Sequence, residues 1–235
     1  MSEIKKPVFF FHGFWGQASD FEFLKTLANN FDAQSIEYTH HELLGPESFI
    51  SDWGQGFWHW VDEMKIQTPL RAVGYSQGGR LLLQAFALAP EKFESLVLIS
   101  SHPGLQSFQE KEQRLVHDRK WAHDFRSLDW ISLQAKWNSQ GVFAGGKEKP
   151  RMEEDFDRNV LAACLENWSL AHQSDFRDMI RSHNDKIHVI LGSEDSKYLK
   201  LYEETKISFQ KAKGAAHRVP SDQPLILAEV LNSIL

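Results

Sequence analysis

Short apolar runs that alternate with helix-like segments are the feature that most constrains the fold of this chain. The runs predict strands at residues 7–13, 34–38, 70–75, 93–101, 185–193 and, with a weaker pattern, 205–213. Apolar residues at helical spacing predict helices at residues 19–31, 48–64, 77–90 and 223–235. Strands and helices in alternation favour an α/β fold, with a mostly parallel sheet that helices cover on both faces.

The segment from about residue 104 to residue 178 interrupts this alternation. It is helix-like, rich in tryptophan and charge, and contains no convincing strand. We interpret it as an insertion between two strands that packs over one end of the sheet as a helical cap. The chain of 235 residues is therefore predicted to be one domain, 1–235, with a cap subdomain at about 104–178.

Composition narrows the possible partners. The formal net charge of −6 argues against nucleic-acid binding. No stretch approaches eighteen apolar residues, so membrane insertion is not expected, and the N-terminus does not resemble a signal peptide. The single cysteine, Cys164, cannot form an intrachain disulfide and lies in an apolar run that predicts a buried position. We expect a cytoplasmic protein, and the sequence does not indicate its oligomeric state.

The stretch Gly74-Tyr75-Ser76-Gln77-Gly78 fits the pattern G-x-S-x-G between a predicted strand and a predicted helix. In that context the glycines permit a sharp turn that exposes a nucleophilic serine. A match of five residues is weak by itself, and the strand and helix around it make it much more specific. The alternative is an ordinary glycine-rich turn.

A serine needs a histidine to accept its proton and an acid to orient that histidine. In folds with this turn the chain order is serine, acid, histidine. Asp195 follows a predicted strand and is the preferred acid, with Glu194 as the alternative, and His217 follows the last predicted strand. Position singles out His217, because the chain has 11 histidines.

The loop after the first predicted strand contains His12-Gly13, which matches a loop that donates one oxyanion-hole amide. We predict the backbone amide of Phe14 as this donor and the amide of Gln77 as the second. His12 itself is predicted to hold the loop in place.

These motifs resemble the α/β-hydrolase superfamily over essentially the full chain. The chain starts at the strand before the His-Gly loop, so the two leading strands of the full fold are expected to be absent or vestigial. Within the superfamily the chain is similar to the 2-succinyl-6-hydroxy-2,4-cyclohexadiene-1-carboxylate synthase (MenH) family of the menaquinone pathway. The similarity rests on the turn "GYSQGGR" and on residues 102–125, 137–143, 161–177 and 192–198.

This resemblance implies a catalytic triad of Ser76, Asp195 and His217. It also implies a set of substrate contacts at Tyr75, Arg80, Gln106, Arg114 and Trp137. A further cap arginine of the family has no clean match, and Arg151 and Arg158 are both candidates. Two departures from the family pattern are Ala216 before His217 and Asn138 after Trp137.

The arginines suit this expectation on physical grounds. Arg80 lies one helical turn after Ser76, where the helix dipole disfavours a cation by about 0.3–1 kcal/mol. A bound carboxylate would reverse that penalty. The alternative is an exposed Arg80 paired with a nearby acid. Arg114 lies in a charged helix that would ordinarily be solvated, and Arg119 is expected to pair with Asp118, Asp124 or another local acid.

The resemblance implies a lyase that eliminates pyruvate from a small polycarboxylate, without a metal or organic cofactor. The alternative is a serine carboxylesterase or carbon–carbon bond hydrolase with the same triad. A third hypothesis, a degenerate hydrolase fold used as a binding module, is disfavoured by the intact order of serine, acid and histidine.

Overall fold

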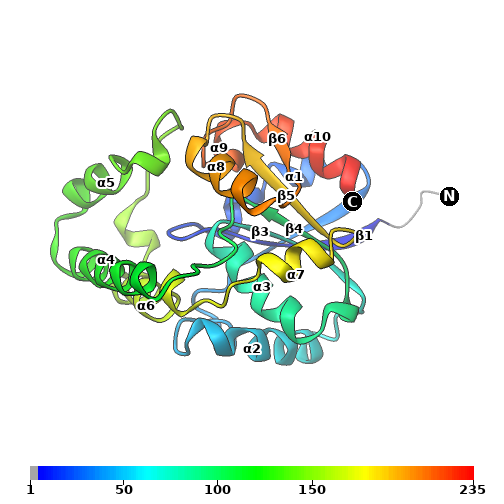
Figure 1. Cartoon of the computed structure of the whole chain (residues 1–235), viewed down its shortest axis with the longest axis horizontal. Coiled ribbons are helices and arrows are strands. Elements are labelled where there is room, and N and C mark those ends of the chain that lie inside the picture. The colour runs from blue at the N-terminus through cyan, green and yellow to red at the C-terminus, as the bar shows by residue number, and fades with distance from the viewer. Residues whose placement is uncertain (1–4) are drawn as a thin grey trace.

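Figure 1 shows a computed structural model of the chain, which describes residues 5–235. Six strands form one sheet in the order β2-β1-β3-β4-β5-β6, and every neighbouring pair is parallel. The strands are β1 (Lys6–Phe11), β2 (Phe31–Ile36), β3 (Leu70–Tyr75), β4 (Phe93–Ile99), β5 (Ile187–Gly192) and β6 (Gln210–Ala212). The parallel sheet expected from the alternation of apolar runs is therefore confirmed.

Helices cover both faces of the sheet. The helices α2 (Ile50–Glu63) and α3 (Gln77–Leu88) pack on one face, and α1 (Leu24–Leu27) and α10 (Pro224–Ile234) pack on the other (Figure 1). Successive residues of β1 point to opposite faces, which is why an unbroken apolar run suits a strand buried on both sides. Phe9 and Phe11 join the cluster under α2 and α3, whereas Val8 and Phe10 join the cluster under α1 and α10.

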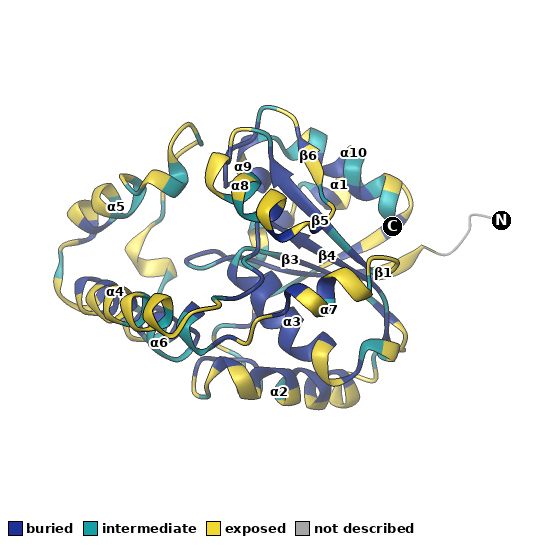
Figure 2. Ribbon diagram, in the orientation of Figure 1, coloured by how far each residue is buried: buried dark blue, intermediate teal, exposed yellow. Residues whose placement is uncertain are grey.

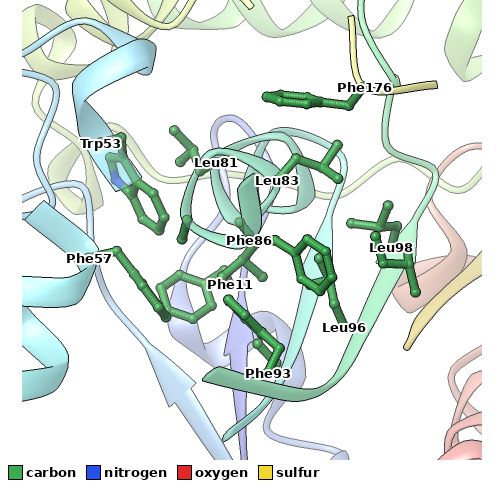
Figure 3. Close-up of a cluster of buried hydrophobic side chains, with 14 of the residues drawn as sticks. Phe11, Trp53, Phe57, Leu81, Leu83, Phe86, Phe93, Leu96, Leu98 and Phe176 are labelled. Atoms are coloured by element: carbon green, nitrogen blue, oxygen red, sulfur yellow. The ribbon is translucent and has the colours of Figure 1, made fainter. Parts of the chain in front are cut away.

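The larger cluster is rich in aromatic rings. Figure 3 shows Phe11 between the side chains of α2, such as Trp53 and Phe57, and those of α3, such as Leu81. The rings of Phe11 and Trp53 meet edge to face with their centres 5.9 Å apart. Each buried ring of this kind contributes about 1.5–3 kcal/mol to stability. The packing holds α3, and with it the turn at Ser76, rigidly against the sheet.

The segment between β4 and β5 contains most of the remaining helices. They are α4 (Phe108–Ser127), α5 (Trp130–Asn138), α6 (Arg158–Asn167) and α7 (Arg177–Ser182), and the described chain has no strand between Ile99 and Ile187. The helices α4, α5 and α6 lie together to one side of the sheet and enclose a separate apolar cluster, which Trp15 joins from the loop after β1 (Figure 1). Most of α4 is exposed (Figure 2). We call residues 104–178 the cap segment.

Two sequence predictions were wrong in detail. The helix expected at 19–31 is only a 3-10 turn (Ala18–Phe21) and the four-residue α1, because Asn232 of α10 binds the backbone where the helix would continue. Its side chain donates to Leu27 O at 3.0 Å and accepts from Asn29 N at 2.8 Å. The strand expected at 205–213 shrinks to β6, because only residues 210–212 pair with β5, and residue 205 ends the unpredicted helix α8 (Ser196–Thr205). A short helix, α9 (Val219–Asp222), follows the loop that contains His217.

Candidate active site

Ser76 occupies the sharp turn between β3 and α3. Its backbone adopts φ 50° and ψ −107°, a conformation that costs a residue with a side chain on the order of 1–3 kcal/mol. The surrounding sheet holds the turn in this state, since Ser76 N donates to Ile99 O of β4 at 2.7 Å. A strained serine at the end of a buried strand is the arrangement that G-x-S-x-G predicts.

The glycines of the motif are explained by close backbone contacts. A Cβ atom on Gly78 would lie 2.3 Å from Phe11 O, and one on Gly74 would lie 2.4 Å from Gly79 Cα. Both distances are too short for any side chain. The start of α3 can therefore approach β1 and β3 only because these positions lack side chains.

Ser76, His217 and Asp195 form a connected set. Ser76 Oγ lies 3.3 Å from His217 Nε2, and His217 Nδ1 lies 2.8 Å from Asp195 Oδ2. His217 and Asp195 are each only 4% exposed, and Asp195 Oδ1 also accepts from Tyr198 N at 3.1 Å. With Nδ1–H donated to Asp195, Nε2 is left to accept the proton of Ser76.

The sequence offered two acids as the partner of His217, Asp195 and Glu194. In the structure Asp195 is the one that contacts His217. Glu194 is exposed, and its backbone amide donates to Ala215 O at 2.9 Å. Asp195 is buried because its side chain caps the first turn of α8. That cap was not visible in the sequence because α8 itself was not predicted.

The backbone amides of Phe14 and Gln77 flank the serine turn. Neither amide has a backbone or side-chain acceptor among the described residues, which leaves both able to donate to a ligand. The loop that contains Phe14 is held by His12, whose Nδ1 lies 2.9 Å from Gly13 O and whose Nε2 lies 3.1 Å from Glu37 Oε1. His12 also stacks on Tyr38 with ring centres 4.3 Å apart, in line with the structural role expected for it.

A cavity of about 500 Å³, here called the main cavity, lies beside Ser76 and His217. Its wall combines residues from the sheet and its loops with residues from the cap segment. Three cationic side chains, Arg80, Arg114 and Lys197, contribute to this wall, and several aromatic rings surround them. The combination suits a ligand with both an apolar ring and negative charge.

Arg80 is buried in the wall of the main cavity, with 7% of its surface exposed. Its guanidinium donates to Gln173 Oε1 and to Trp168 O, each at 2.7 Å, and both acceptors are neutral. Burial and the positive charge of Arg114 lower the pKa of Arg80 to about 10, so it stays charged at neutral pH. The described residues provide no carboxylate in contact with Arg80, which excludes the alternative of an exposed, paired arginine.

Arg114 lies on α4 and reaches the main cavity. Its Nε donates to both carboxylate oxygens of Asp118, each at 2.8 Å, and Asp118 also accepts from Ser169 Oγ at 2.7 Å. Burial alone would raise the pKa of Asp118, but hydrogen bonds from His117 and Arg114 hold it below its ordinary value. Asp118 therefore orients Arg114 while leaving part of its guanidinium free.

The pairing expected for Arg119 was wrong. Asp118 pairs with Arg114, and Asp124 pairs with Lys136 at 2.6 Å. Arg119 is exposed on α4 and has no ion pair with any described residue. Asp118 and Asp124 are buried and already paired with Arg114 and Lys136, whereas Arg119 is exposed.

The other three substrate contacts that the resemblance implied lie in different places in the structure. Trp137 of α5 lines the main cavity and packs on Phe14 with ring centres 4.9 Å apart. Tyr75 instead lines a smaller pocket that Ser76 also lines. Gln106 is exposed and outside both cavities, so its predicted role as a substrate contact is not supported. The start of α4 explains this position, because a capping box between Ser107 and Glu110 fixes the chain just after Gln106.

The smaller pocket, here called the side pocket, has one of the two candidate cap arginines in its wall. Its volume is about 60 Å³, and Arg151 is part of its wall together with Ser76 and His217. Arg151 Nε donates to Trp15 O at 2.6 Å, which draws it to the loop after β1. Arg158 binds Glu153 Oε1 and Leu128 O instead, and lines neither cavity. Of the two candidates, Arg151 therefore shares a pocket with Ser76.

Sequence reasoning missed several cavity residues. Tyr198 lies with its ring centre 4.7 Å from that of His217, and Lys197 precedes it in the first turn of α8. Their position directly after Asp195 could have identified them from the sequence as residues near the site. Trp168 and Cys164 also line the main cavity from the cap segment. Cys164 is buried as predicted, and burial raises the pKa of its thiol well above the ordinary value.

Metal clusters and membrane-spanning helices are both absent from residues 5–235. Within that range no group of at least three His, Cys, Asp or Glu side chains is placed to hold a metal ion. No helix described there has both the length and the apolar composition needed to cross a membrane.

Known structures share this fold. MenH from S. aureus superposes with a TM-score of 0.81 and 14% identity, over 99% of this chain and 94% of that one. A thermophilic esterase from Thermogutta terrifontis superposes with a TM-score of 0.74 and 16% identity, over 97% of this chain and 88% of the esterase. A family model described as the alpha/beta hydrolase fold matches residues 56–129.

The parallel sheet and the sharp serine turn thus define a protein of the α/β-hydrolase class. Two synthases with similar sequences identify the family within this class. The 2-succinyl-6-hydroxy-2,4-cyclohexadiene-1-carboxylate synthase of Escherichia coli O1:K1 / APEC is 32% identical over 168 residues, which cover 69% of this chain and 67% of that protein. The synthase of Salmonella newport is 30% identical over the same shares. The chain belongs to the 2-succinyl-6-hydroxy-2,4-cyclohexadiene-1-carboxylate synthase family.

Proposed function

We propose that this enzyme is a carbon–oxygen lyase of menaquinone biosynthesis. It eliminates pyruvate from 2-succinyl-5-enolpyruvyl-6-hydroxy-3-cyclohexene-1-carboxylate and gives 2-succinyl-6-hydroxy-2,4-cyclohexadiene-1-carboxylate, the compound that the relatives are named for making. Arg80 carries the proposal: it is a buried guanidinium with only neutral partners in a cavity that also contains Ser76. A polycarboxylate substrate supplies the negative charge that Arg80 lacks.

The reaction begins with removal of the ring proton beside the succinyl ketone. Ser76 Oγ takes this proton while His217 Nε2, 3.3 Å away, accepts the serine proton. Asp195 stabilises the imidazolium that forms on His217 and keeps its Nδ1 protonated. The serine thus acts as a base, and no covalent serine adduct is required.

Electrons from the broken C–H bond move toward the ketone, whose oxygen becomes negative. The amides of Phe14 and Gln77 are free to donate to this oxygen, as they would to a tetrahedral oxyanion. The electrons then return through the ring to form the second double bond, and the bond between the ring and the enolpyruvyl oxygen breaks. The departing enolpyruvate takes up a proton to become pyruvate, so no water is consumed.

In this proposal Arg80 and Arg114 bind substrate carboxylates and turn the reacting proton toward Ser76. Trp137, Trp121 and Phe143 cover the ligand from the cap segment. The cap segment is then a subdomain of a single domain, and its function is to keep water from the reacting groups.

The test is to give the purified protein the succinyl-enolpyruvyl substrate and a p-nitrophenyl ester side by side, in ¹⁸O-labelled water. We expect pyruvate release without hydrolytic incorporation of label, and no acyl-Ser76 by mass spectrometry. A burst of acyl-enzyme from an ester, with no pyruvate from the menaquinone precursor, would overturn the lyase proposal. It would favour the carboxylesterase or carbon–carbon hydrolase alternative, for which the same serine, histidine and amides are suited.

A further inference from the structure

The side pocket adjoins the main cavity at the reacting groups. Ser76 and His217 line both, so they stand where the two spaces meet. The side pocket has a volume of about 60 Å³, which corresponds to roughly four to six water-sized groups. It can therefore hold a small molecule of a few non-hydrogen atoms but not the ring of a larger substrate.

Arg218, the residue after His217, lines the side pocket and is 4% exposed. Its guanidinium donates to Lys147 O at 3.0 Å and to Asn138 Oδ1 at 2.6 Å, and it lies over the ring of Phe143 at 4.0 Å. All these partners are neutral. Burial lowers the pKa of Arg218, although two nearby acids, Asp222 and Glu148, partly oppose this effect.

Arg151 places a second guanidinium in the same wall. It donates to Trp15 O at 2.6 Å and to Lys149 O at 3.2 Å, which are also neutral acceptors. Burial and the charge of Arg218 lower the pKa of Arg151 to about 10, so the two arginines repel each other but stay protonated at neutral pH.

The other charged groups of the pocket cancel only part of the positive charge of the two arginines. Lys149 pairs with Asp20, and both line the pocket. Asp222 is buried nearby and offsets part of the charge of Arg218, but its Oδ1 and Oδ2 are bound by Lys147 N at 2.7 Å and Ala216 N at 3.0 Å, and it forms no ion pair with either arginine. One buried guanidinium, Arg218, and one half-buried guanidinium, Arg151, both with neutral hydrogen-bond partners, cost free energy that a bound anion would recover.

We propose that the side pocket binds the carboxylate of the small 2-oxo acid that leaves in the elimination, namely pyruvate, through Arg218 and Arg151. The inference rests on the proposed function and adds a place for the leaving group. The ring and its carboxylates occupy the main cavity, the three-carbon fragment occupies the side pocket, and the bond that breaks lies between them beside Ser76. The two arginines stabilise the negative fragment as it departs and hold it apart from the ring.

The experiment is a titration of the purified, unliganded protein with ¹³C-labelled pyruvate, followed by NMR. The variants are Arg218→Gln and Arg151→Gln, which remove one charge each and keep hydrogen-bond donors for the neutral partners. We expect each to raise the dissociation constant of pyruvate at least tenfold. Arg218→Lys should recover part of the loss, because it restores the charge but not the planar fork. Pyruvamide, which has no charge, should bind wild type much more weakly than pyruvate.

Three control variants test whether the loss of pyruvate binding is specific to the side pocket. Arg158→Gln changes a cap arginine outside both cavities. Asn138→Ala breaks the contact between Arg218 and α5 but keeps the charge. Arg114→Gln removes a charge from the main cavity. Each should change the dissociation constant of pyruvate by less than about threefold, the scale of a lost surface interaction.

An equal loss in Arg114→Gln would place pyruvate in the main cavity and overturn the inference, as would wild-type affinity in both Arg218→Gln and Arg151→Gln. The outcome is independent of the lyase proposal, since binding is measured without substrate. If the protein releases pyruvate from the precursor but neither variant weakens pyruvate binding, only the side-pocket inference fails. If the variants weaken binding but no pyruvate is released from the precursor, only the lyase proposal fails.

Discussion

At the scale of single residues, the positive charge of Arg80 lies near the N-terminus of a helix, where the helix dipole disfavours a cation. Arg80 lies in the first turn of α3, and the helix dipole opposes its charge by about 0.3–1 kcal/mol. Gln173 and Trp168 O hold the guanidinium, and Gln173 is fixed in turn because its Nε2 donates to His102 O at 2.9 Å. The charge is thus positioned by neutral groups and remains available to a ligand.

The first prediction concerns the residues joined to Ser76. We expect Ser76→Ala, Asp195→Asn and His217→Ala each to lower kcat by orders of magnitude with the fold retained, because one hydrogen-bonded unit performs the proton transfer. A double variant should lose little beyond its worse single variant. The measurement is steady-state pyruvate release, with circular dichroism as the check on folding. Glu194→Gln is the control, and a severe loss there would contradict the choice of Asp195.

The second prediction concerns the arginines of the main cavity. Replacement of Arg80 or Arg114 by Ala should reduce kcat/KM by about 1.5–3 kcal/mol, the value of a charge-assisted hydrogen bond. Lysine at either position should restore only part of the loss. Arg119→Ala is the matched control, because Arg119 lies on the same helix as Arg114 but is exposed. Equal effects of Arg119→Ala and Arg114→Ala would show that Arg114 has no special role.

At the scale of elements, β3, the turn at Ser76 and α3 form one rigid unit. The strain at Ser76 is held because α3 lies against β1 and β3 at distances that admit no side chain at Gly74 or Gly78. Aromatic packing from α2 then presses α3 onto the sheet (Figure 3). Contacts far from Ser76 in the sequence therefore maintain its conformation.

The third prediction follows from this packing. Gly78→Ala should lower the free energy of unfolding by about 1–3 kcal/mol, because its Cβ would lie 2.3 Å from Phe11 O and the backbone must shift. Gly141→Ala is the control, since a Cβ there meets no atom within 4 Å. Urea denaturation of both variants measures the difference. Equal stability of the two variants would mean that the start of α3 can move away from β1 at little cost.

At the scale of the whole molecule, two structural units meet at the loop after β1. The sheet has a core on each face, and the cap segment has a third core that Trp15 joins (Figure 1). The same loop is tied to β2 through Glu37, whose Oε1 lies 3.1 Å from His12 Nε2 and whose Oε2 accepts from Ala18 N at 3.0 Å. A carboxylate at this junction therefore contributes to the stability of the protein.

The fourth prediction concerns the pH dependence of stability. Burial alone would raise the pKa of Glu37, but its contacts with His12 and Ala18 N lower it from 4.5 to about 2. A folded pKa below the unfolded value means that the ionised form stabilises the protein above about pH 4.5, and that this contribution is lost as the pH falls toward 2.

The measurement is urea denaturation of wild type and Glu37→Gln between pH 7 and pH 2.5. The two should differ at neutral pH and converge in acid. The difference should be on the order of 1 kcal/mol or less, since 42% of the side chain of Glu37 is exposed. Glu63→Gln, an exposed position at the end of α2, should follow wild type throughout. A constant difference between Glu37→Gln and wild type across this range would contradict the assignment.

The sequence by itself determined the parallel sheet and the place of Ser76 within it. Apolar runs buried on both faces leave little choice of architecture, and glycines around a serine between a strand and a helix leave little choice of turn. These features depend on residues that are close in the sequence. The order of Ser76, an acid and His217 then follows, because each lies at the end of a strand of the same sheet.

The direction of individual side chains was decided only by the tertiary structure. Asp195 rather than Glu194 meets His217, at the residue where α8 begins. Arg151 rather than Arg158 lines the pocket that Ser76 also lines, and Trp15 O holds its guanidinium there. Gln106 looked suitable in the sequence and lies outside both cavities. The side pocket itself joins segments from four parts of the chain. Such contacts arise from the way the cap segment packs on the sheet, and neighbours along the sequence carry no information about that packing.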